Sequence, residues 1–222
     1  MTDVMRCCRG VFALALGFSA LVVAGHNPDE RAPAEQAPAS IPEVLPRDEE
    51  IALAESAAPA HLRAKATVYV LDRSGFVLAR QGSNGFTCIV NRDSPLGRKP
   101  TCYDREGTAT ILPKVLRVGE LLMRGTPLAA IEREIEDGFR TGRFVAPRRP
   151  GIAYMLSKGN RDFSPATGKV RPFPPHVMFY APNLTNEDIG SLGDGAGGLP
   201  FIAYQGSHGF MIMMVPDETA NP

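Results

Sequence analysis

The sequence predicts an α+β fold: a mostly antiparallel sheet, which could curl into a partly closed barrel, covered by two central helices. Short segments rich in β-branched and aromatic residues lie toward both ends of residues 64–216. Between them lie two segments with helical periodicity. Without its first 25 residues the chain keeps about 197 (222 − 25), a length that suits one domain with a tail.

Three strands are expected in the first half of this region. Residues 66–71 are rich in β-branched and aromatic side chains, and residues 76–80 return after a turn at 72–75. Residues 86–91 follow a second turn at 82–85, where Asn-Gly tolerates positive φ. Consecutive strands joined in this way predict a three-stranded meander.

The middle of the chain is predicted to be helical. Residues 115–124 repeat apolar side chains at helical spacing, and Gly125 ends the pattern. Thr126 and Pro127 then form a typical helix start. The second helix, over 127–141, has an apolar face and a charged face, as expected of a helix that covers a sheet.

Four more strands are predicted after the helices. They cover residues 151–157, 176–181, 200–204 and 210–215, and the last two form a hairpin. A long loop is expected between the first two of these strands.

The N-terminus resembles a targeting segment. Arg6 and Arg9 precede an uncharged, mainly apolar run of 14 residues, Val11–Ala24, and polar residues follow from His26. This pattern predicts a secretory signal peptide over 1–25, and its apolar run is shorter than the roughly 20 residues that span a bilayer. We therefore expect an exported protein, periplasmic or extracellular, that contacts a membrane only through this segment before cleavage. An uncleaved anchor is the alternative.

Two further segments flank the expected domain. Residues 26–63 carry eight acidic and three basic side chains, are rich in Pro and Ala, and lack aromatic residues. Such a composition buries little apolar surface, so it predicts a disordered acidic linker. Residues 217–222 are expected to form a C-terminal tail.

Cleavage would remove Cys7 and Cys8 and leave Cys88 and Cys102. Disulfides persist outside the cytoplasm, so these two residues are predicted to form a bridge. The segment between them holds two prolines and little else to order it. The alternative is a catalytic thiol with a histidine partner.

The clearest charge asymmetry is basic. Residues 138–171 hold eight Lys or Arg against Asp162 alone, a net charge of +7. Arginine binds carboxylate and phosphate oxygens in a bidentate manner, so an Arg-rich edge would favour a small anionic ligand. The candidate ligand-binding residues are Arg140, Arg143, Arg148, Arg149 and Arg161. The alternative is a solvated face paired with neighbouring acids. Nucleic acid is not an expected partner, because the whole chain has a net charge of zero and no stacking platform accompanies the arginines.

His176, His208 and Ser207 are the candidate catalytic residues. A hydrolase would need one of these histidines close to Ser207 or to an aspartate, namely Asp162, Asp188 or Asp194. The alternative is that both histidines are ordinary strand-end or turn residues. The sequence has no metal-ligand spacing and no cofactor motif, so neither a metal nor a cofactor is expected.

Several segments together resemble a family of predicted exported bacterial proteins of unknown function. They are residues 85–88, 101–104, 107–110, 138–144 and 176–182, and the resemblance extends over about residues 60–216. It supports export and implies no activity, cofactor or catalytic residue.

The leading functional hypothesis is a non-enzymatic exported domain that binds a small anionic ligand at the Arg-rich edge. A hydrolase is the second hypothesis, and a structural envelope interaction module is the third. The sequence does not indicate an oligomeric state.

Overall fold

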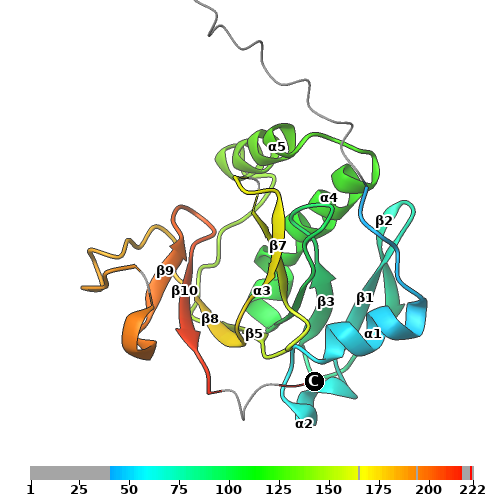
Figure 1. Cartoon of the computed structure of the whole chain (residues 1–222), viewed down its shortest axis with the longest axis horizontal. Coiled ribbons are helices and arrows are strands. Elements are labelled where there is room, and N and C mark those ends of the chain that lie inside the picture. Colours follow the sequence, from blue (N-terminus) through cyan, green and yellow to red (C-terminus); the bar gives the residue numbers. More distant parts are fainter. Residues whose placement is uncertain (1–40, 165, 194, 217–220, 222) are drawn as a thin grey trace, which may run out of the picture. The chain divides into compact units, whose positions relative to one another are not determined.

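The computed structural model describes residues 41–222 other than 165, 194, 217–220 and 222 (Figure 1). Its strands are β1 (Thr67–Asp72), β2 (Gly75–Arg80), β3 (Thr87–Asn91), β4 (Lys99–Tyr103), β5 (Ile152–Met155), β6 (Arg161–Ser164), β7 (Lys169–Pro172), β8 (His176–Tyr180), β9 (Phe201–Tyr204) and β10 (Phe210–Met214). Its helices are α1 (Arg47–Glu55), α2 (Ala60–Arg63), α3 (Arg105–Thr110), α4 (Leu112–Met123), α5 (Leu128–Arg140) and the 3₁₀ turn η1 (Ala196–Gly198).

Eight of these strands form one sheet in the order β2-β1-β3-β4-β5-β8-β10-β9. Together with the helices, this sheet confirms the α+β class. The sheet remains open, with β2 and β9 as its edges, so the partly closed barrel is not formed. Strands β6 and β7 form a separate hairpin within the expected long loop.

The expected meander of the first three strands is wrong in its connection. β3 pairs in parallel with β1 rather than with β2, whereas the other neighbours in the sheet are antiparallel. The loop after β2 crosses the start of β1, where the Thr67 amide donates to the Phe86 carbonyl over 2.8 Å. Gly82 permits this crossing, because a Cβ there would lie 2.2 Å from the Thr67 nitrogen.

The segment between the two cysteines is more ordered than its prolines suggest. It contributes β4, a buried central strand that includes Pro100. β4 pairs with β3 along its whole length but with β5 only at Cys102 and Tyr103. Pro100 therefore lies outside the second pairing, which is how a residue without an N–H fits inside a sheet.

Both faces of the sheet are covered. Neighbouring residues of one strand point to opposite faces, and in β3 they belong to two different cores. Ile89 of β3 belongs to a core between the sheet and helices α3 and α4. Cys88, its neighbour, belongs to a second core. This core includes Ala54 near the end of α1 and Ala57 and Ala58 just after it. Helix α5 forms an outer layer on α4 through a third cluster that contains Leu122 and Ile135. α4 and α5 are the two central helices that the sequence predicts.

Part of the predicted acidic linker is folded. Of residues 26–63, those from 41 onward are described, and they contain α1 and α2. α1 packs on the sheet through two fully buried side chains. Ala54 contributes an apolar contact, and Glu50 pairs with Arg92. The amino-acid composition does not reveal this helix, because its buried face consists of small alanines and one paired carboxylate and not of large apolar side chains. Residues 26–40 and the predicted signal peptide lie outside the described residues.

Cys88 and Cys102 form the predicted disulfide. They lie opposite each other on β3 and β4, and both are fully buried. A buried bridge of this kind is typical of proteins from oxidising compartments.

Replacing both cysteines with alanine is expected to lower the free energy of unfolding by about 3 kcal/mol, the chain-entropy value for a loop of this length. Urea denaturation of the oxidised protein and the double variant measures the difference. A loss below about 1 kcal/mol would show that β3 and β4 hold their register without the bridge.

The end of the chain returns to the start of the domain. Asn221 donates from its side chain to the Ser56 and Ala58 carbonyls, and its carbonyl accepts from the Lys158 amide. The rest of the expected tail, residues 217–220 and 222, is outside the described part. Within the described part of the chain, no helix has the length and apolar character needed to cross a membrane.

Candidate functional site

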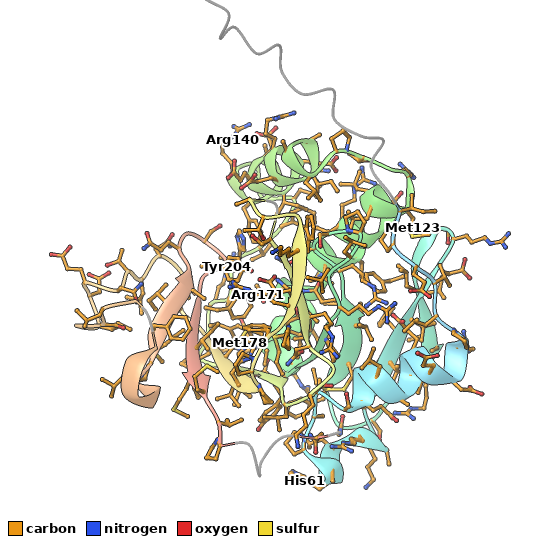
Figure 2. All side chains as sticks on the ribbon, in the orientation of Figure 1. His61, Met123, Arg140, Arg171, Met178 and Tyr204 are labelled. Atoms are coloured by element: carbon orange, nitrogen blue, oxygen red, sulfur yellow. A yellow bond between two sulfur atoms is a disulfide. The ribbon has the colours of Figure 1, made fainter. Side chains whose placement is uncertain are left out.

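The structure places the five candidate arginines at separate points, where most of them meet acidic partners. Arg140 pairs with Asp137 on α5, and Arg143 pairs with Glu134. Arg149 pairs with Glu106 at the start of α3. Figure 2 shows Arg140 at the outer end of α5, away from Met178 and Tyr204 in the body of the domain.

The other two arginines do not join them. The Arg148 backbone amide donates to Glu106, and Arg161 donates to the backbone carbonyls of Lys158 and Asn160. Three surface hollows in the described part each contain one of the five arginines: Arg140 lines two of them and Arg161 lines the third. This arrangement matches the solvated, internally paired face that was the alternative.

The two candidate histidines lie at opposite ends of the β8–β10 pair. His176 is opposite Met214, and Tyr180 is opposite Phe210. These two pairs are four residues apart, roughly 13 Å at about 3.3 Å per residue. His208 lies beyond Phe210, so the histidines do not form a direct dyad.

Ser207 makes no hydrogen bond with either histidine among the described residues. Asp188 accepts from Thr185, and Asp162 pairs with Lys99, so both aspartates have other partners. Asp194 lies outside the described residues. The described side chains therefore contain no Ser-His-acid arrangement at hydrogen-bond distance.

Both histidines nevertheless line one cavity of about 160 Å³ between the sheet and α4, which we call the central cavity. Most of its wall surface is apolar, although ten of its seventeen lining residues are polar or charged. The apolar lining residues are Val115, Val118, Met155, Phe173, Met178, Phe210 and Ile212. The polar and charged lining residues are Asn91, Arg92, Asp93, Lys99, Thr101, Tyr103, Lys114, His176, Tyr204 and His208.

Lys114 is the unusual cation of this cavity. It lies on α4 beside Val115, and among the described residues it has neither an ion pair nor a hydrogen bond. Burial lowers the pKa of Lys114 to about 8, an effect that nearby Asp93 opposes and Lys99 reinforces. An amine that changes charge near neutral pH is therefore present in an apolar cavity.

Lys99 differs from Lys114 because its charge is compensated. Its ammonium group contacts Asp93 and lies 2.8 Å from a carboxylate oxygen of Asp162 on β6. Burial alone would lower the pKa of Lys99, but Asp93 and Asp162 raise it above its usual range. Since Asp93 and Asp162 bind Lys99, Lys114 is left without a carboxylate in direct contact, and Asp93 compensates its charge only from a distance.

The two histidines are uncharged at neutral pH. Burial lowers the pKa of His208 to about 4, and nearby Lys114 lowers it further in the same direction. Burial also lowers the pKa of His176. His208 stacks on Phe139 of α5, with 4.6 Å between ring centroids, and its buried Nδ1 has no hydrogen-bond partner in the described structure.

The two buried imidazoles predict acid sensitivity. The folded pKa of His208 lies below its unfolded value of about 6.5, so the unfolded chain binds more protons between these values. Stability is therefore lost as the pH falls from about 6.5 to about 4. Between pH 7 and pH 5 we expect His208 to contribute about 1 kcal/mol of this loss, after allowance for its partial exposure.

Urea denaturation at these two pH values tests the effect. His208→Phe should reduce the loss, whereas His61→Phe on α2, where His61 is exposed, should leave it unchanged. Equal losses in wild type and His208→Phe would contradict the assignment.

The sequence pointed to the two histidines but not to Lys114 or Lys99. Lys114 precedes Val118 by four residues, so it lies on the apolar face of α4. A lysine on an apolar helix face was the available signal. Lys99 gave no such signal, because its position depends on the unpredicted strand β4.

Within the described ranges, no group of three or more His, Cys, Asp or Glu side chains is arranged to hold a metal ion. No family model, no curated protein and no solved structure matches this chain.

Proposed function

We propose that this chain is an exported, non-enzymatic binding protein for a small anionic molecule, which occupies the central cavity with its anionic group at Lys114. The class of ligand is the one that the basic segment predicts, but the location differs. The arginines of that segment are dispersed and mostly paired with acids, whereas Lys114 has no acid in direct contact and the nearby Asp93 is bound to Lys99.

The observation that carries this proposal is the charge arrangement in the cavity. Lys114 is half-buried, and a cation partly withdrawn from water without a direct partner costs free energy, which an anion that enters the cavity would offset. The apolar walls suit a ligand with an apolar body, and burial strengthens the attraction between opposite charges. Export is supported by the N-terminal sequence pattern and by the disulfide, which together favour a periplasmic or extracellular location.

Calorimetric titration with benzoate and benzamide tests the proposal. The two compounds have nearly the same shape, but only benzoate is charged. We expect benzoate to bind at least about tenfold more tightly, since a hydrogen bond to a charged group contributes about 1.5–3 kcal/mol. Equal affinities, or no binding of either compound, would contradict the proposal.

The pH dependence of benzoate binding provides a second test. Asp93 and Lys99 are the charged groups that act on the pKa of Lys114, Arg92 of the cavity wall is paired with Glu50, and His208 is uncharged above pH 6. Benzoate affinity should therefore fall about tenfold per pH unit above pH 8, as the Lys114 ammonium loses its proton. A flat profile between pH 7 and pH 9 would place the anion elsewhere.

A further inference from the structure

His176 has a defined tautomer. Its Nδ1 lies 2.8 Å from the carbonyl oxygen of Pro174, and a carbonyl can only accept a hydrogen bond. Nδ1 therefore carries the hydrogen and donates it. In the neutral ring the other nitrogen, Nε2, is consequently an acceptor.

This acceptor has no partner. His176 is fully buried, it lines the central cavity, and no described group lies within hydrogen-bond distance of its Nε2. The ring is held in place. Phe173 packs against it with 4.6 Å between the ring centroids, and β8 pairs with β5 on one side and with β10 on the other. It cannot turn toward solvent, so only a molecule inside the cavity can satisfy Nε2.

The partner of Nε2 must be a hydrogen-bond donor. An anionic oxygen could bind Nε2 only if the ring became an imidazolium ion, which both burial and nearby Lys99 disfavour. Lys99 cannot itself be the donor to Nε2 while its ammonium group remains on Asp93 and Asp162. A ligand hydroxyl meets the requirement.

We propose that the ligand of the central cavity is a hydroxy acid, whose carboxylate binds Lys114 and whose hydroxyl group donates to Nε2 of His176. His176 would then determine specificity, because a ligand without the hydroxyl leaves a buried acceptor unsatisfied. This inference rests on the proposed function and makes it more specific.

Competition titrations with matched aromatic acids test it on the purified, oxidised full chain. The probes are benzoate, its three monohydroxy isomers, and the corresponding methyl-substituted benzoates as controls for size. We expect at least one hydroxybenzoate to bind about tenfold more tightly than both benzoate and the methyl compound of the same substitution position. If benzoate binds in a Lys114-dependent manner and no isomer is preferred, the inference is wrong while the proposed function stands.

Two variants assign the preference to His176. His176→Phe keeps an aromatic ring but removes the acceptor, so it should bring the ratio of hydroxybenzoate affinity to benzoate affinity close to one. His176→Gln keeps a carbonyl acceptor and should restore part of the preference. A preference that survives in His176→Phe would assign the hydroxyl to another group.

Nitrogen NMR of the wild-type protein gives an answer even if His176→Phe does not fold. Binding of the preferred hydroxybenzoate should shift the Nε2 resonance of His176 while Nε2 remains unprotonated. Protonation of Nε2 on binding would show that His176 binds the anionic group, and an unchanged resonance would show that the ligand does not reach it. Either result would overturn the inference.

Discussion

Glu50→Gln is expected to lower the free energy of unfolding by about 3–5 kcal/mol, the range for removing one member of a buried ion pair. Glu50 is fully buried, and the side chain of its partner Arg92 is 1% exposed. Both carboxylate oxygens of Glu50 accept from one guanidinium nitrogen of Arg92, over 3.2 and 3.0 Å. In Glu50→Gln, Arg92 would keep its charge in the interior without a counter-charge in contact, and its acceptors would be the neutral amide oxygen and the Val90 carbonyl, 3.4 Å away.

A matched control separates this effect from the loss of any acidic side chain. Glu43 pairs with Arg98 at the surface, where its side chain is 69% exposed, so Glu43→Gln should change the stability by less than about 1 kcal/mol. Replacing both Glu50 and Arg92 with apolar residues of similar size should recover much of the loss. Urea denaturation measures the free energy of unfolding of all three variants. If Glu50→Gln lowers it no more than Glu43→Gln does, α1 does not depend on the buried pair.

Lys114→Met should have opposite effects on stability and on ligand binding. Burial lowers the pKa of Lys114 from 10.5 to about 8, so the folded state disfavours its charge at neutral pH. At about 1.4 kcal/mol per pKa unit, removal of the charge should stabilise the fold at pH 7 by up to about 3 kcal/mol. Benzoate affinity should meanwhile fall about 10- to 100-fold, because the charged partner is lost.

The size of the stability change depends on pH in a defined way. The folded pKa of Lys114 lies below the unfolded pKa, so the cost of its charge is fully present below pH 8 and disappears as the pH rises past 10.5. The difference between Lys114→Met and wild type should therefore shrink between pH 8 and pH 10. Lys158→Met is the control, since this exposed lysine lies in the turn after β5. A Lys114→Met protein that is less stable than wild type and still binds benzoate would contradict the account.

Most of the sheet and both central helices could be predicted from the sequence, because their side chains follow simple periods. Strand β4 could not, since Pro95 before it and Pro100 within it are typical of loops, and its order comes from the neighbouring strand and the disulfide. α1 could not either, because it is held by alanines and by the single pair between Glu50 and Arg92. Neither feature leaves a local pattern.

The site was harder to predict than the fold. A run of like charges such as that of residues 138–171 attracts attention, but ion pairs within one helix or with a neighbouring loop can neutralise it. The functional candidates instead come from four distant segments: β4, α4, the start of β8 and the turn before β10. Their convergence depends on the strand order, which places β4 two strands from β8.

The most direct test of the account is the titration of the Lys114 side chain by NMR, with and without benzoate. The account predicts that the free protein titrates near pH 8 and that benzoate raises this pKa, because an anion in the cavity favours the ammonium form. A pKa near 10.4, the ordinary value for lysine, that benzoate does not change would contradict the central claim.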